Sequence, residues 1–319
     1  MFDGRETIVP LNSESTFQAN LVQDLTHQAQ DAINIHAQAS PPNATPSDQL
    51  ASIVTLELGL TSAQFWDNAA GLLEVHGATG GPVNLANDPY YPGINDVLGG
   101  DPTGAPFNPT AFTVFTAWQN LERGGRDYGD RYDRSEARMA IAAGEKIFNS
   151  TPLTIHNVRG LNDNPALANP ISGTCTSCHD TPNVGDHSVA LPLDIGTSHA
   201  AAYEHDPDIA AALAELDFPD VPVYLVSGCP DPFNPTPSGS DAPTSFYTVD
   251  PGKALVTGHC SDFNRGKGPI LRGLAARAPY FHDGAAKDLR EVVNFYNQRF
   301  QMGLSEKEKS ELIAFLNSL

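Results

Sequence analysis

The sequence G-T-C-T-S-C-H-D, from Gly173 to Asp180, carries the most specific chemical pattern in this chain. Cys175 and Cys178 are separated by two residues, and His179 follows directly. Thioether attachment of haem uses two thiols that add across the two vinyl groups, and a two-residue spacing matches the separation of those vinyls. The adjoining His179 would then reach the iron as its proximal ligand. The motif therefore predicts one covalently bound haem c.

Three other interpretations compete with haem attachment. A redox-active dithiol also uses C-x-x-C, but in a βαβ context that this sequence does not suggest. A zinc site needs a second pair of ligands. Cys229 and Cys260 are the only other cysteines, and they are widely separated. Chance occurrence of the motif is the third interpretation.

The segments around the motif predict a mostly helical frame. We expect a helix over Asp133–Asn149, capped by Asp133 and Glu136, with Gly144 as a flat spot on its surface. A second helix begins after Ser305, whose S-x-x-E pattern is followed by an apolar stripe that includes Phe315. Gly144 should meet Phe315, as in a class I cytochrome c-like domain with long irregular loops. Further helices are expected over Gln18–Ala39, Ser47–Gly59, Ala63–Val75, Ala111–Leu121, Ile209–Leu216 and Lys287–Asn297. A short extended segment is expected over Leu191–Gly196. The sequence predicts no run of strands.

The charge of the chain excludes some partners and suggests another. The formal net charge is −20, and from Met1 to Asn120 one basic residue, Arg5, stands against twelve acids. Phosphate binding needs clustered Lys and Arg, so nucleic acid is not expected as a partner. A strongly acidic surface would attract a small basic redox protein, although solubility alone also explains the charge. No stretch predicts a membrane span.

Cys229 and Cys260 each lie in a loop that contains glycine, and we expect them to form a disulfide in an oxidising compartment. The alternative is two unrelated buried thiols. Haem attachment and a disulfide both predict a periplasmic or otherwise exported protein. The N-terminal sequence MFDGRETIVPLNSES does not resemble a signal peptide, which conflicts with export.

The stretch GKGPILRGLAARAPYFHDGAAKDLREVVNFYNQRF, Gly266–Phe300, resembles the C-terminal domain of di-haem cytochrome c peroxidases and MauG-like enzymes. FDGRE near the N-terminus also resembles the F-W-D-G-R segment of the family's first, peroxidatic domain. The resemblance implies a helical remnant of that domain over residues 1–125 and a cytochrome c domain over residues 126–319. In the family the first haem motif precedes F-W-D-G-R, so we expect a truncated chain whose intact gene encodes a second haem.

The resemblance also implies residues for the distal side of the first haem. The family places a Gln, and an acid ten residues later, above the catalytic haem. Gln28 aligns with the Gln, and Gln38 stands where the acid would be. Because an amide cannot act as a general acid or base, we expect little peroxide turnover by this chain alone. His36 could substitute for the acid or ligate iron, or could simply be solvated.

Two residues are candidates for the sixth ligand of the predicted haem. Tyr296 aligns with the Tyr of MauG-like proteins and should point inward from its helix. Met302 lies beyond that helix, in a short turn that would have to fold back. Tyr296 could instead be a core aromatic. Arg272 could contact a haem propionate or form a surface salt bridge.

The resemblance further implies a calcium ion held partly through backbone oxygens near Arg277 and Pro279, with another ligand upstream of Met1. Two functions follow for the chain. One is an enzyme of the peroxidase or MauG-like class that uses hydrogen peroxide; the other is a mono-haem electron carrier with no enzymatic activity. A haem-based sensor or a non-haem dithiol protein is a third, weaker hypothesis.

Overall fold

The computed structural model describes residues 14–39, 45–122, 134–189, 191–198, 207–216, 222–230 and 245–319. Asp133, the FDGRE segment and the region around the predicted boundary at residue 125 lie outside these residues. The helices are α1 (Glu14–Asp31), α2 (Ser47–Leu58), α3 (Pro82–Leu85), α4 (Ser135–Ser150), α5 (Pro207–Leu213), α6 (Ala254–Thr257), α7 (Leu289–Arg299) and α8 (Glu306–Asn317). A π-helical turn, Ala32–His36, extends α1.

Strands are short and lie in two-stranded antiparallel sheets. The pairs are β1 (Trp66–Asp67) with β2 (Gly71–Leu72), β3 (Leu153–Ile155) with β4 (Ile171–Gly173), β5 (Pro192–Leu193) with β8 (Gly266–Lys267), and β6 (Tyr224–Ser227) with β7 (Ser245–Thr248). The expectation of no strand run therefore missed these small ladders. Helices still form most of the regular structure, and no helix among the described residues is long and apolar enough to cross a bilayer.

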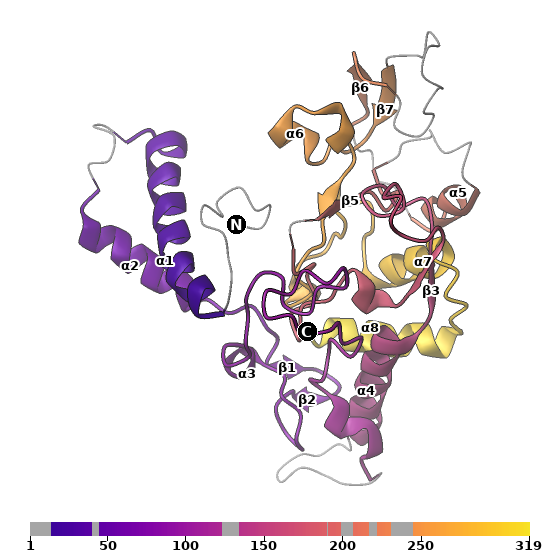
Figure 1. The fold of residues 1–319 in the computed structure, drawn as a ribbon. Helices are drawn as coiled ribbons and strands as arrows, with labels where there is room; N and C mark the ends of the chain where they lie inside the picture. Colours follow the sequence, from indigo (N-terminus) through magenta and orange to yellow (C-terminus); the bar gives the residue numbers. More distant parts are fainter. Residues whose placement is uncertain are drawn as a thin grey trace.

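The main core lies where α4 crosses α8, with α7 beside α8 (Figure 1). A Cβ at Gly144 would lie 2.6 Å from the Phe315 Cβ and would also strike the Glu311 carbonyl, so only glycine fits this approach. The predicted contact between Gly144 and Phe315 is confirmed. Ser305 and Glu308 form the predicted capping box at the start of α8.

The core also takes side chains from residues that precede the predicted domain boundary. Leu73, Phe112, Phe115 and Trp118, all fully buried, share one apolar cluster with Phe315. Phe112 packs edge-on against Phe148 of α4, and their ring centroids are 5.2 Å apart. Residues on both sides of the predicted domain boundary therefore build the same core. The division into two domains stays a prediction.

Two expected helices are wrong, and each has a polar cause. In the segment Ala63–Val75 the Asp67 side chain accepts hydrogen bonds from the N–H groups of Ala69 and Ala70, at 2.8 and 2.7 Å. This turn takes up backbone N–H groups that a helix would use. The segment therefore forms the β1–β2 hairpin instead of a helix.

In the segment Ala111–Leu121 side chains of α4 take the backbone donors. Glu145 accepts from the Phe115 N–H at 2.7 Å, and Asn149 accepts from the Phe112 N–H at 3.1 Å. Only a 3₁₀ turn, Thr116–Asn120, remains there. The backbone donors are thus satisfied by tertiary partners that a local pattern does not reveal.

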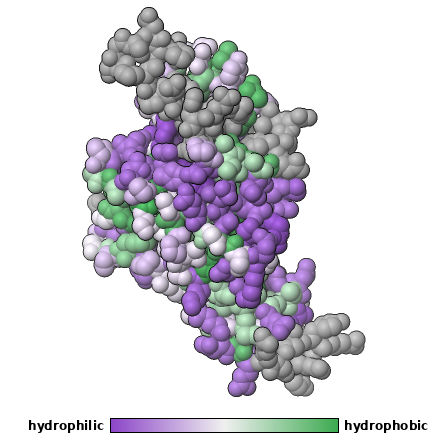
Figure 2. Space-filling model, turned by 90° about the vertical axis from the view of Figure 1, so that its right-hand side faces the viewer, coloured by the Kyte–Doolittle hydropathy of each residue, from purple (hydrophilic) through white to green (hydrophobic). Residues whose placement is uncertain are grey.

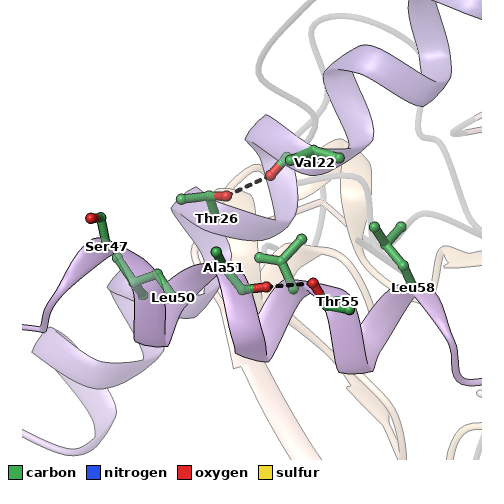
Figure 3. A pocket seen from close by; sticks show the side chains of 8 residues that line it. Val22, Thr26, Ser47, Leu50, Ala51, Thr55 and Leu58 are labelled. Atoms are coloured by element: carbon green, nitrogen blue, oxygen red, sulfur yellow. Dashed lines mark hydrogen bonds between the residues drawn. The ribbon is translucent and has the colours of Figure 1, made fainter.

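α1 and α2 pack on each other and lie apart from α4, α7 and α8 (Figure 1). The cleft between them is lined by apolar and hydroxyl side chains (Figure 3), and the Thr26 and Thr55 hydroxyls donate to carbonyls of their own helices, those of Val22 and Ala51. No acidic, basic, cysteine or histidine side chain lines it. The cleft is a packing seam between two helices and offers no catalytic chemistry.

We predict that Gly144→Ala lowers the free energy of unfolding by about 2 kcal/mol, because the methyl group must separate α4 from α8. Helix propensity alone would favour alanine by about 1 kcal/mol, so the sign is diagnostic. Urea denaturation followed by circular dichroism measures the change. Gly266→Ala is the control, because its Cβ would meet no atom within 4 Å. Equal stability of Gly144→Ala and wild type would contradict the crossing described here.

The predicted disulfide between Cys229 and Cys260 is confirmed, with a Cα–Cα distance of 5.4 Å. The bridge closes a loop of 31 residues, and chain entropy gives it about 3–4 kcal/mol of stabilisation. We therefore expect Cys229→Ala/Cys260→Ala to lower the melting temperature. Thermal denaturation with and without reductant checks this, since reductant should affect wild type and leave the double variant unchanged.

Candidate functional site

The C-x-x-C-H motif lies in a tight turn that leaves the small β3–β4 sheet. Gly173 ends β4, and Cys175–Ser177 form a 3₁₀ turn. Thr174 and Ser177 form a capping box around the turn, in which the Thr174 N–H donates to the Ser177 hydroxyl at 3.0 Å. The His179 N–H donates to the Cys175 carbonyl at 3.0 Å. These local bonds hold both cysteines and the histidine on one short segment.

Both thiols lie against apolar side chains. Cys175 packs against the main core and, with Cys178, against a second cluster that includes Leu153, Ile155 and Phe300. Burial raises the pKa of each thiol to about 12, with a smaller contribution from Cys178 to Cys175 and from Asp180 to Cys178. Redox-active C-x-x-C pairs instead have a cysteine of lowered pKa. The surroundings of the two thiols therefore disfavour the dithiol hypothesis.

The His179 ring is fixed by one short hydrogen bond. Its Nδ1 lies 2.6 Å from the carbonyl oxygen of Gly185. A carbonyl only accepts, so Nδ1 carries the proton and Nε2 carries a lone pair. Burial lowers the pKa of His179, which keeps the ring neutral. A neutral imidazole whose Nδ1–H is held by a carbonyl is the usual state of a metal-ligating histidine.

Gly185 is a residue that the sequence pattern did not single out. Its φ is +77°, and a Cβ there would lie 2.7 Å from the Phe112 ring and 2.9 Å from Leu271. Only glycine can place this carbonyl behind His179. The Phe148 ring, 6.0 Å from the His179 ring between centroids, packs beside the same imidazole. The histidine is therefore held by a turn and by α4 together.

The two candidate sixth ligands both pack against the apolar cluster that the cysteines contact. Tyr296 and Met302 belong to the apolar cluster that contains Cys175 and Cys178. The expected inward position of Tyr296 is confirmed, and burial, with the nearby Cys178 and Cys175, raises the pKa of its hydroxyl. Met302 also reaches this cluster, because the turn after α7 folds back. The Met302 N–H holds this turn by donating to the Asn297 carbonyl at 3.1 Å.

Arg272 is buried and only partly satisfied. It is 1 % exposed, and its Nε donates to the Asn183 carbonyl at 2.7 Å. Both terminal nitrogens, Nη1 and Nη2, lack a hydrogen-bond partner, and burial lowers its pKa to about 10. A surface salt bridge is therefore wrong for Arg272. Buried donors of this kind need an acceptor, and a carboxylate provides one.

Gln28 and Gln38 lie elsewhere. Gln28 is on α1, and Gln38 follows the π-helical turn with a φ of +50° and an exposed side chain. His36, at the end of that turn, is exposed as well. The helix that carries Gln28 packs against α2, and Gln38 and His36 follow at its C-terminal end. Their predicted role above a different haem stays a prediction, and so does the calcium ion near Arg277 and Pro279.

Comparison with known proteins gives partial matches. The chain is 30% identical over 159 residues to cytochrome-c peroxidase IdrP2 of Denitromonas iodatirespirans, covering 46% of this chain and 36% of the relative. It is 30% identical over 166 residues to cytochrome-c peroxidase IdrP1 of Pseudomonas sp. strain SCT, covering 48% and 38%. Over 78 residues, 23% of each chain, it is 39% identical to cytochrome c551 peroxidase of Nitrosomonas europaea.

No protein-family model matches the chain, and no solved structure gives a significant match. The chain spans little more than a third of the length of the first two relatives. It is therefore similar, over almost half of its own length, to proteins named cytochrome-c peroxidase.

Proposed function

We propose that this chain is a haem c electron-transfer protein of the cytochrome-c peroxidase type. Cys175 and Cys178 would form the two thioethers, and His179 would ligate the iron. The observation that carries the proposal is the His179 Nδ1–Gly185 hydrogen bond of 2.6 Å, because it leaves a fixed Nε2 lone pair next to two free thiols. The similarity to cytochrome-c peroxidases supports the same cofactor.

The surroundings of the motif fit this group chemically. The apolar cluster that surrounds both thiols suits a macrocycle that is largely apolar. The two partnerless nitrogens of Arg272 fit the charge and planar shape of a propionate. Cys229 and Cys260 are bonded to each other, so Cys175 and Cys178 are the two cysteines that can form thioethers. Two thioethers attach one haem.

Bound haem would supply a one-electron Fe(III)/Fe(II) couple. The chain's own residues favour electron transfer over peroxide cleavage at this centre. Tyr296 and Met302 pack against the same apolar cluster as the cysteines and are candidates for a second axial ligand, whereas peroxide needs an open position and a general acid or base. Peroxidase activity, as in the named relatives, would need a second haem site. The alternative function is a mono-haem electron carrier with no enzymatic activity, in which no second haem takes part.

The charge and the disulfide suggest the partner and the compartment. Hydrophilic residues cover much of the face shown in Figure 2, and the chain carries a net charge of −20. We infer that a small basic redox protein exchanges electrons with it. The Cys229–Cys260 disulfide supports export to an oxidising compartment such as the periplasm.

We predict one covalent haem per chain when the protein is exported in a host with a haem-maturation system. A denaturing gel stained for haem should show colour at full length. Cys175→Ala/Cys178→Ala should remove all of it, because no thioether can form. Cys229→Ala/Cys260→Ala is the matched control and should keep the colour. A colourless wild-type band at good expression would sink the proposal.

We further predict that Tyr296 is the axial partner of His179 in the ferric state. Tyr296→Phe should then change the visible spectrum strongly and raise the reduction potential, because a phenolate stabilises ferric iron. Met302→Leu should leave both nearly unchanged. A near-infrared Met-to-iron band that disappears in Met302→Leu would instead assign Met302 as the ligand and give a higher-potential carrier.

A further inference from the structure

A second group of ligand-type side chains lies immediately beyond the haem motif. Asp96, Asp180 and His187 are 3 %, 0 % and 2 % exposed. Each offers one oxygen or nitrogen atom, and these atoms all lie within 4.8 Å of one another. The three residues come from two loops that are far apart in the sequence. Two carboxylates and an imidazole are thus buried together by the tertiary fold.

The three side chains are held in place by surrounding backbone groups. The Asp96 oxygens accept from the N–H groups of Leu98 and Gly100, at 3.2 and 2.7 Å. A Cβ at Gly100 would collide with the Asp96 carboxylate, so glycine lets this loop close tightly around it. The Asp180 Oδ1 accepts from the Ser188 N–H at 2.7 Å. Both carboxylates are therefore oriented before any ligand arrives.

One oxygen in the cluster is left over. Asp180 Oδ2 is fully buried and has no hydrogen-bond partner. It lies 3.7 Å from His187 Nδ1, which accepts a long hydrogen bond of 3.5 Å from the Val189 N–H. A separation of 3.7 Å is too long for a hydrogen bond. It is close to the spacing of two ligands around one small cation, which is about 3.4 Å for tetrahedral bonds of about 2.1 Å.

The cluster also lacks a positive charge of its own. The Lys267 ammonium group bonds to Asp186 Oδ2 and to the His187 carbonyl, each at 3.2 Å. Two carboxylates buried together without a cation are unfavourable. A bound cation removes this cost.

We propose that Asp96, Asp180 and His187 bind a divalent metal ion of the zinc class. The imidazole decides the class, because calcium and magnesium prefer oxygen ligands, whereas zinc accepts nitrogen and carboxylate oxygen together. Three protein ligands leave one position for water. The site uses none of the residues assigned to the haem, so it stands whether or not that assignment is correct.

The ion would tie the loop that supports His179 to the loop that carries Asp96. Hydrogen bonds already join these loops on both sides of the cluster. The Gly93 N–H donates to the Ser188 carbonyl at 2.7 Å, and the Asn95 amide donates to the Asp180 carbonyl at 2.9 Å. The loop from Asp180 to Ser188 contains Gly185, whose carbonyl holds His179. The ion would therefore stabilise the loop behind the proximal histidine.

The test uses the full, haem-loaded chain, in which thioethers occupy the other thiols that could bind zinc. The protein is stripped with chelator, exposed to Zn²⁺, Mn²⁺ or Ca²⁺ in separate samples, desalted and analysed for metal. We expect about one retained Zn²⁺ per chain and no retained Ca²⁺. We also expect the melting temperature to rise by about 4 °C when the free Zn²⁺ concentration is about a hundred times its Kd. If haem fails to attach, the same titration is run after alkylation of the free thiols.

Two variants and a control make the assignment specific. Asp96→Asn and His187→Gln should each weaken Zn²⁺ binding by about 100-fold or more, because each removes one of three ligands. Asp194→Asn changes an equally buried acid outside the cluster and should keep wild-type zinc affinity even if it lowers stability. The proposal would be overturned if wild type retained no zinc, if both variants retained as much zinc as wild type, or if wild type retained Ca²⁺ in preference to Zn²⁺.

Discussion

The close approach of α4 and α8 at Gly144 is the constraint on which the rest of the structure depends. Without a side chain at this position the two backbones come into contact, and Phe148 and Phe315 then lie 5.7 Å apart between ring centroids. Phe112 packs edge-on against both rings. Phe148 also forms one wall beside His179. The helix crossing therefore positions the imidazole from one side, and a wider crossing would remove that wall.

The loop from Asp180 to Ser188 contacts both His179 and the loop that carries Asp96. Its Gly185 carbonyl fixes the tautomer of His179, while Asp180 and His187 face the loop that carries Asp96. Arg272 holds the same segment through the Asn183 carbonyl. These contacts are buried or partly buried, so each polar group must find a partner or raise the free energy of the fold. This explains why a loop rather than a helix supports the site.

The four cysteines are separated by geometry into two chemical roles. Cys175 and Cys178 share one short turn, whereas Cys229 and Cys260 come together from distant loops and form a disulfide. An exported chain with four thiols can mispair. Here Cys175 and Cys178 pack against apolar side chains, and burial raises the pKa of both thiols, which slows their reaction with other thiols before any haem attaches.

The sequence by itself determined the C-x-x-C-H segment, the capped helix α8, the meeting of Gly144 with Phe315 and the disulfide pair, because each depends on local spacing or on residue types with few uses. It did not determine the secondary structure of Ala63–Val75 or of Ala111–Leu121. In the first segment the Asp67 side chain accepts from backbone N–H groups, and in the second the distant Glu145 and Asn149 do so. Only the tertiary structure placed Gly185 behind His179, brought Met302 to the apolar cluster that the cysteines contact, and joined Asp96 to Asp180 and His187. These pairings arise from burial, in which groups far apart in sequence must satisfy one another once water is excluded.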